Sequence, residues 1–199
     1  MKRTLFGTTV ALALLALPAA GRAQTGWSLG ANLAGASFSG GTGPRGGLGG
    51  GVTVEYGLTE RLGVYLAGQH NGSVGTVDDQ QYGVLTSGTT QGDLGLRYRL
   101  GRSTSSFRPY VSLAASAISL HESAPVSGEN SFSSTTYGLA GTLGVGVQHA
   151  ISRHTALDLG LQRTIGGLTR IKADGEDRKL WSDRGFGASR LRVGITWRP

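Results

Sequence analysis

Alternation of apolar residues with small or polar residues is the feature of this sequence that most limits how the chain can fold. In the segment 188–198, one set of alternate positions is apolar and the other holds glycine, threonine or arginine. The apolar set there is Leu191, Val193, Ile195 and Trp197. A period of two places the two sets on opposite faces of a β-strand. No stretch after the N-terminal segment has a helical period, so the sequence predicts an all-β fold.

The alternation recurs in eight segments, which predicts eight strands. Each segment is roughly 10–15 residues long, which is more than a globular strand needs but suits a tilted strand that crosses a bilayer. Strands can span lipid only as a closed barrel, because every backbone N–H and C=O needs a protein partner there. The predicted strands are 26–37, 48–57, 62–73, 88–100, 108–120, 135–150, 155–166 and 188–198. We therefore expect an eight-stranded, antiparallel, up-and-down transmembrane β-barrel.

The lengths of the connections support this topology. Short connections at 57–61, 101–107 and 151–154 alternate with four long ones. The long connections are 38–47, 74–87, 121–134 and 167–187. Outer-membrane barrels combine short periplasmic turns with long outer loops and keep both termini in the periplasm. An even number of strands is required for this arrangement, and eight satisfies it.

The N-terminus has the three parts of a secretory signal. Lys2 and Arg3 precede an apolar run at 5–17, and small residues lead to a predicted cleavage after Ala23. The apolar run is too short to span a bilayer as a helix. We expect a signal peptide at 1–23 and one barrel domain at 24–199. The chain has no Cys, so no disulfides support the exported protein.

Five aromatic residues are predicted to form a girdle at the periplasmic boundary of the membrane. Each falls near the periplasmic end of a predicted strand, where an amphipathic ring can lie between lipid and water. These residues are Trp27, Tyr56, Tyr98, Tyr110 and Trp197.

The face opposite the apolar one is predicted to line the interior and to carry charge. An eight-stranded barrel is just wide enough for side chains to fill it. Two interpretations of these charges are open. They form a paired polar plug or, because arginine outnumbers acid, they line a narrow pore that favours anions. The predicted interior charges are Glu55, Asp93, Arg97, Arg99, Asp158, Arg190 and Arg192.

Several segments resemble the small outer-membrane β-barrel proteins, the group that includes OmpA transmembrane domains, OmpX and OmpW. The hairpins at 54–68 and 138–162, the strand at 108–116 and the closing strand at 189–199 carry the resemblance. It covers nearly all of the chain after residue 23 and implies an outer-membrane location. The chain ends Trp197-Arg198-Pro199, whereas such proteins usually end in an aromatic residue that the insertion machinery reads.

No constellation for catalysis, cofactor binding or metal binding emerges from the sequence. The four His residues have no metal-ligand spacing, and the adjacent residues His121, Glu122 and Ser123 point apart and do not make a triad. The glycine-rich run at 40–51 lacks the Lys-Ser/Thr pair of a phosphate loop. We expect a protein that is not an enzyme and needs no cofactor.

The expected function is a structural or surface-interaction role in the cell envelope. The alternative is a small passive, porin-like pore for small or apolar solutes, and a soluble periplasmic ligand-binding barrel is disfavoured. Expected partners are outer-membrane lipid and lipopolysaccharide, the barrel-insertion machinery, and an extracellular partner of the long loops. The net charge of +7 falls to about +4 without Lys2, Arg3 and Arg22, and no basic block indicates nucleic-acid binding.

Overall fold

The structure is a computed structural model that describes residues 25–39, 46–76, 84–100, 105–125, 131–173 and 176–199. The predicted signal peptide at 1–23 lies outside the described residues. The described residues include no helix that is long and apolar enough to cross a membrane.

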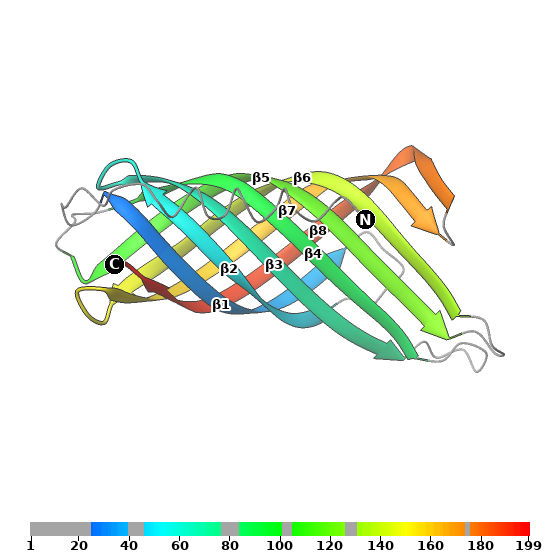
Figure 1. Ribbon diagram of the computed structural model, residues 1–199, viewed down its shortest axis with the longest axis horizontal. Coiled ribbons are helices and arrows are strands. Elements are labelled where there is room, and N and C mark those ends of the chain that lie inside the picture. Colours follow the sequence, from blue (N-terminus) through cyan, green and yellow to red (C-terminus); the bar gives the residue numbers. More distant parts are fainter. Residues whose placement is uncertain (1–24, 40–45, 77–83, 101–104, 126–130, 174–175) are drawn as a thin grey trace, which may run out of the picture.

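Eight antiparallel strands form a closed barrel in which each strand pairs with its neighbours in the sequence (Figure 1). The barrel closes where β1 pairs with β8, so the predicted fold class is confirmed. The strands are β1 (Gly26–Ser39), β2 (Gly46–Gly57), β3 (Leu62–Thr76), β4 (Val84–Arg99), β5 (Phe107–Pro125), β6 (Ser131–Ala150), β7 (Thr155–Ala173) and β8 (Glu176–Trp197).

The register of the strand pairs sets the tilt of the strands. Followed from partner to partner, it leads from Leu29 once around the barrel and back to Ser39, ten residues further along β1. An eight-stranded barrel with this stagger has strands tilted by roughly 40–45°. Its interior is narrow, and side chains fill it.

The two ends of the barrel differ. At the turn end, defined here by the connections 58–61 and 151–154, hydroxyls close the chain reversals: Thr59 Oγ1 accepts bonds from the N–H groups of Arg61 and Leu62, and Ser152 Oγ accepts one from Thr155. At the opposite, hairpin end, the strands run on past the predicted boundaries. The extension is greatest in β7 and β8.

Two of the four connections predicted to be long are therefore shorter than predicted. The predicted loop 167–187 is mostly strand, since β7 runs to Ala173 and β8 begins at Glu176. The loop predicted at 121–134 is likewise mostly taken up by β5 and β6. Apolar alternation marked only the part of each strand with an apolar face. The extensions lack regular apolar alternation, so backbone pairing alone reveals them.

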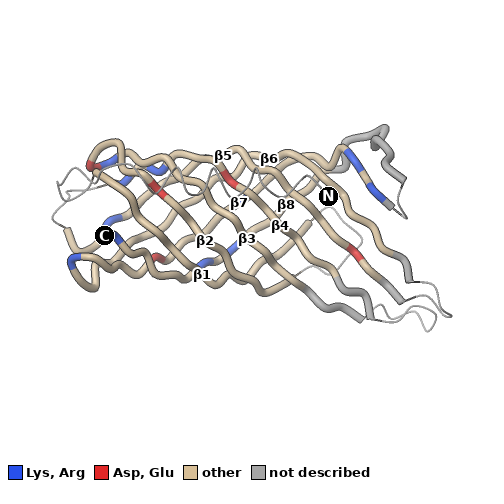
Figure 2. The backbone as a smooth tube through the Cα atoms, in the orientation of Figure 1, with Lys and Arg blue, Asp and Glu red and all other residues tan. Residues whose placement is uncertain are grey.

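The distribution of polarity is the reverse of that in a soluble domain. Large apolar side chains lie on the outer wall, where Leu33, Leu48 and Leu139 are 71–79% exposed. The most buried side chains are polar, and Arg190, Thr142 and Thr164 are 0% exposed. Figure 2 shows charged residues along the barrel, several of them near the end that holds the C-terminus. An apolar outer wall around a polar interior suits a protein whose surroundings are lipid.

Candidate functional site

The interior of the barrel holds the charged residues. Because side chains alternate between the two faces of each strand, the outward apolar set leaves polar positions inside. All of the residues predicted as interior charges are at most 9% exposed and lie there: Glu55, Asp93, Arg97, Arg99, Asp158, Arg190 and Arg192. Four guanidinium groups thus share the interior with three carboxyl groups.

Glu55 on β2 binds two arginines of β4 at the turn end. Arg97 Nη1 donates to Glu55 Oε2 at 2.8 Å, and Arg99 Nη2 donates to the other oxygen of the same carboxylate. Asp158 Oδ2 lies 3.7 Å from Arg97 Nη1. Gly63 on β3 makes room, because a Cβ at that position would clash with the Glu55 carboxylate. Buried charges are costly unless they are paired, so these groups stabilise the barrel only as a complete set.

Two tyrosines enclose the Arg97 guanidinium. Its Cζ atom lies 5.4 Å from the ring centre of Tyr65 and 4.4 Å from that of Tyr110, within the range of cation–π attraction. Tyr110 Oη donates to Asp158 Oδ1 at 2.7 Å and accepts a bond of 3.3 Å from Arg192 Nη2. Tyr110 therefore joins the cation of β4 to the carboxylate of β7 and the cation of β8.

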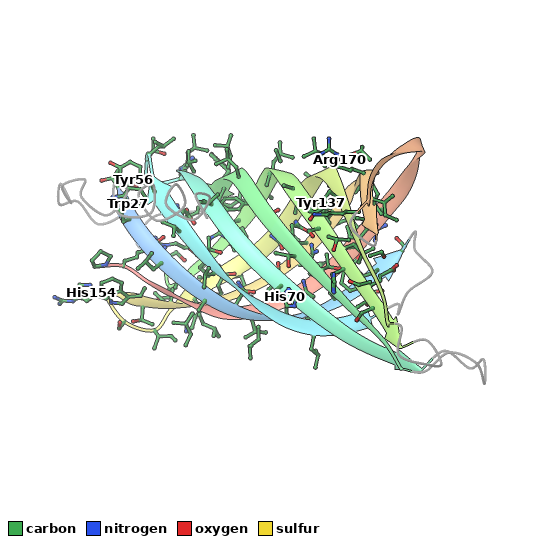
Figure 3. The ribbon with its side chains drawn as sticks, turned by 45° about the vertical axis from the view of Figure 1, so that its right-hand side comes forward. Trp27, Tyr56, His70, Tyr137, His154 and Arg170 are labelled. Carbon is green, nitrogen blue, oxygen red and sulfur yellow. The ribbon has the colours of Figure 1, made fainter. Side chains whose placement is uncertain are left out.

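The placement of Tyr110 corrects the predicted aromatic girdle. Tyr110 is 2% exposed and points into the barrel, because it occupies an inward position of β5. The sequence argument used only its depth along the strand and not the face on which it lies. The other four residues of the predicted girdle lie on the outer wall at the turn end, and the rings of Trp27 and Tyr56 are 5.0 Å apart (Figure 3).

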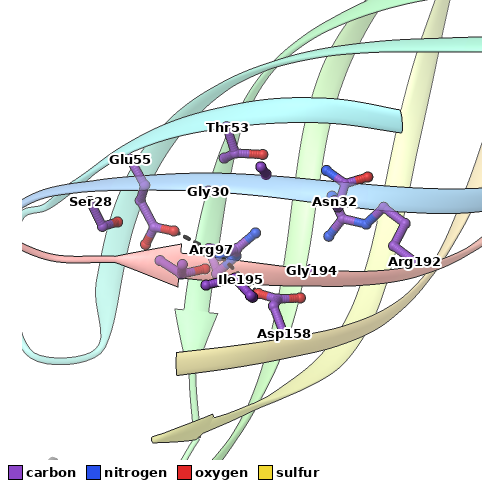
Figure 4. A pocket seen from close by; sticks show the side chains of 12 residues that line it. Ser28, Gly30, Asn32, Thr53, Glu55, Arg97, Asp158, Arg192, Gly194 and Ile195 are labelled. Carbon is purple, nitrogen blue, oxygen red and sulfur yellow. Dashed lines mark hydrogen bonds and ion pairs between the residues drawn. The ribbon is translucent and has the colours of Figure 1, made fainter. Parts of the chain in front are cut away.

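A small cavity adjoins this cluster between β1, β2 and β8. Figure 4 shows Glu55, Arg97, Asp158 and Arg192 around it, with Asn32 close to Arg192. It has room for about one water molecule. Among the described residues, Arg192 Nε and Asn32 Oδ1 have no protein hydrogen-bond partner. The cavity is too small for a solute larger than water or a small ion.

The charged cluster continues to the mouth of the barrel at the turn end. Arg198, which follows β8, donates from Nη2 to Gln148 Oε1 at 3.1 Å. Burial, and then the positive charges of Arg99 and Arg108, lower the pKa of Arg198 to about 10. Positive charge therefore accumulates at this mouth.

A belt of hydrogen bonds crosses the middle of the interior. Gln91 Nε2 donates to Asp93 Oδ1 at 2.6 Å and to Thr142 Oγ1 at 3.1 Å. The hydroxyl oxygens of Thr142 and Thr164 are 2.8 Å apart, and Arg190 Nη1 donates to Thr164 Oγ1 at 3.0 Å. These bonds connect β4, β6, β7 and β8 across the barrel, so side chains occupy the cross-section here.

An apolar plug fills the interior towards the hairpin end. We define the plug as four buried residues, Ile118, Leu168, Phe186 and Ala188, with Phe38, Leu120 and Ala140 packed against them. The rings of Phe38 and Phe186 are 6.3 Å apart. The sequence argument missed the plug because it treated every inward position as polar. The sequence did contain a signal for the plug, since Phe186 and Ala188 occupy alternate positions on the same face of the strand as Arg190 and Arg192.

The charged and polar groups of the interior bind one another. Among the side chains that the structure describes, no three His, Cys, Asp or Glu residues come together as metal ligands. The carboxylates Glu55 and Asp158 are engaged by arginine or tyrosine donors. His121 on the outer wall of β5 has Thr135 as its hydrogen-bond partner at 3.1 Å.

Comparison with known proteins agrees with this architecture. The profile of the family described as outer membrane protein beta-barrel domain matches residues 6–198. The chain belongs to this family, and an outer-membrane location follows from it. No curated protein matches the sequence.

Solved structures of small outer-membrane barrels share the fold. Neisserial surface protein A is 18% identical, with a TM-score of 0.59 and coverage of 88% of this chain and 98% of that one. OprG from Pseudomonas aeruginosa is 14% identical, with a TM-score of 0.58 and coverage of 87% and 96%. Ail of Yersinia pestis is 12% identical, with a TM-score of 0.56 and coverage of 87% and 98%. At these identities the likeness concerns the fold alone.

Proposed function

We propose that this protein is a sealed structural barrel of the outer membrane that displays its hairpin end at the cell surface. The observation that carries the proposal is the apolar plug, which lies beyond the charged cluster and fills the interior there. A barrel built for conduction needs a continuous polar path. Here Phe186 and Leu168 fill the place where such a path would have to pass.

The proposed orientation places both termini in the periplasm and the hairpin end outside. Short turns at one end and strand extensions at the other are the asymmetry found in outer-membrane barrels. The extensions of β5 to β8 form paired ribbons beyond the apolar wall (Figure 1). A surface partner would meet these ribbons. The protein would act by presenting a rigid surface, with no chemical step.

A narrow anion-favouring pore is the second candidate. The excess of arginine inside and the small cavity beside Arg192 favour it. In this conformation the plug closes the path. Conduction would require Phe186 and Leu168 to leave the interior.

Conductance in a planar bilayer tests the proposal. We expect no single-channel steps from the natural protein and small steps from Phe186→Ala, because that substitution opens the plug. The control is Phe107→Ala, which removes an outward ring at the turn end. Each sample must first show the heat-dependent gel shift of a closed barrel. Steps of equal size from the natural protein and Phe186→Ala would refute the sealed barrel and favour the pore.

A further inference from the structure

One arginine lies on the lipid-facing wall of the barrel. Arg163 occupies an outward position of β7, between the outward residues Leu161 and Ile165, which are 53% and 63% exposed. Leu191 of β8, also outward, is 57% exposed. A charged residue in such surroundings is expensive and indicates a functional site.

The depth of Arg163 can be estimated from the register. It lies eight residues beyond Thr155, which pairs with Trp197 of the turn-end aromatic set. At about 3.3 Å per residue and a tilt near 40–45°, this is roughly 19 Å along the barrel axis. The apolar band of such barrels is about 25 Å tall. Arg163 is therefore in the half of the band nearer the hairpin end, and its long side chain can reach towards that boundary.

The wall is shaped to hold this guanidinium. Arg163 Nη1 donates to Ser189 Oγ of β8 at 2.9 Å. Gly187 has no side chain, and a Cβ there would lie 3.0 Å from Arg163 Nη2 and would clash with Ser39 Oγ. Gly187 faces outward yet is buried, because its neighbours cover it. The guanidinium thus rests in a notch over Gly187, close to the Ser39 hydroxyl of β1.

The Arg163 guanidinium supplies the charge of the notch. Among the described residues, no carboxylate lies within ion-pair distance of Arg163. Further along β7 towards the hairpin end, Arg170 and Lys172 are exposed, and Arg170 points away from the barrel (Figure 3). Three cations therefore follow one strand from the apolar band to its edge.

We propose that Arg163, Ser189 and Ser39 form a binding site for the phosphate-bearing headgroup of an anionic lipid in the outer leaflet. A guanidinium offers a phosphate two parallel, charge-assisted hydrogen bonds. The exposed leucines and isoleucine beside the site would contact the acyl chains, which selects a lipid over a soluble phosphate. The leaflet assignment rests on the proposed orientation, whereas the site itself does not.

Native mass spectrometry of the folded chain in a phosphate-free maltoside detergent tests the site. The probe is a bisphosphorylated lipid A, compared with the same lipid after removal of both phosphates. We expect one phosphorylated lipid to bind the natural protein, with affinity about tenfold lower for Arg163→Gln. Gly187→Ala keeps the charge but fills the notch, and we expect a loss of similar size. Arg153→Gln, in the turn 151–154, is the matched control and should leave binding unchanged.

Three outcomes would overturn the site. They are equal loss in Arg153→Gln and Arg163→Gln, equal binding of the dephosphorylated lipid, and displacement of the lipid by millimolar inorganic phosphate. The orientation is tested separately on intact cells with a membrane-impermeant maleimide, using Ser123→Cys at the hairpin end and Ser152→Cys at the turn end. Because the chain has no native Cys, labelling reports only these positions. Labelling of Ser152→Cys alone would refute the orientation, and the lipid site would still be decided by the detergent experiment.

Discussion

The two halves of the barrel interior are filled in different ways. Towards the turn end, Glu55, Arg97 and Asp158 form a network in which each charge depends on its partners. Towards the hairpin end, Phe186, Leu168 and their neighbours pack by apolar contact. The charged half is destabilised by the removal of any one member of its network, because a single missing partner leaves a buried charge unpaired. The apolar half depends on how well its side chains fill the volume.

Loss of the Glu55 carboxylate should cause the largest loss in the free energy of unfolding. In Glu55→Gln, Arg97 and Arg99 would stay buried without the charge that binds both, and we expect a loss of about 3–5 kcal/mol in the free energy of unfolding. Urea titration of the protein in lipid vesicles, followed by tryptophan fluorescence, measures it. Glu60→Gln in the exposed turn is the control and should change the free energy by less than about 0.5 kcal/mol. Equal values for the two variants would mean that the network does not stabilise the barrel.

Truncation of a side chain inside the apolar plug should cause the second largest loss in the free energy of unfolding. Leu168→Ala removes a buried side chain and leaves a cavity, which costs about 2–4 kcal/mol. Leu161→Ala on the same strand makes the identical change on the lipid-facing wall, where lipid fills the space, and we expect about 1 kcal/mol or less. The same urea titration compares them. A larger loss in the outward variant would contradict the division between interior and wall.

The Tyr110 hydroxyl should contribute less to the free energy of unfolding than the Glu55 carboxylate or the Leu168 side chain. Tyr110→Phe keeps the ring against Arg97 and removes only the bonds to Asp158 and Arg192, with an expected loss of about 1–3 kcal/mol. Tyr98→Phe, whose ring lies on the outer wall, serves as the control and should be nearly neutral. If both variants behaved alike, the inward placement of Tyr110 would be in error.

A change in the belt of hydrogen bonds between the two halves should lower the free energy of unfolding least. Thr142→Val preserves the shape of the side chain and removes a hydroxyl that is bonded to Ser116 and Thr164. We expect a loss of about 1 kcal/mol, because Gln91 Nε2 still donates to Ser116 and Thr164. A loss as large as that of Glu55→Gln would show that the belt and the charged network act as one unit.

Much of the interior could be predicted from the alternation of side chains between the two faces of each strand. Counting in twos from Leu191 places Arg190 and Arg192 on the opposite face, and the structure puts both inside. The same count, continued from Leu161, assigns Arg163 to the outer wall. The prediction for Tyr110 was wrong because it used the position along the strand and ignored the face on which the side chain lies. The predicted strand 155–166 ended too early because strands were recognised only by their apolar residues.

The sequence by itself determined the class of fold and the sorting of side chains between the two faces, because the period of two is a property of the single strand. Only the tertiary structure decided which residues meet across the barrel. Glu55 and Arg97 are 42 positions apart and touch because the registers of β2 with β3 and of β3 with β4 bring them to neighbouring levels of the interior. The plug and the Gly187 notch arise in the same way, since each joins residues from strands whose register no single segment encodes.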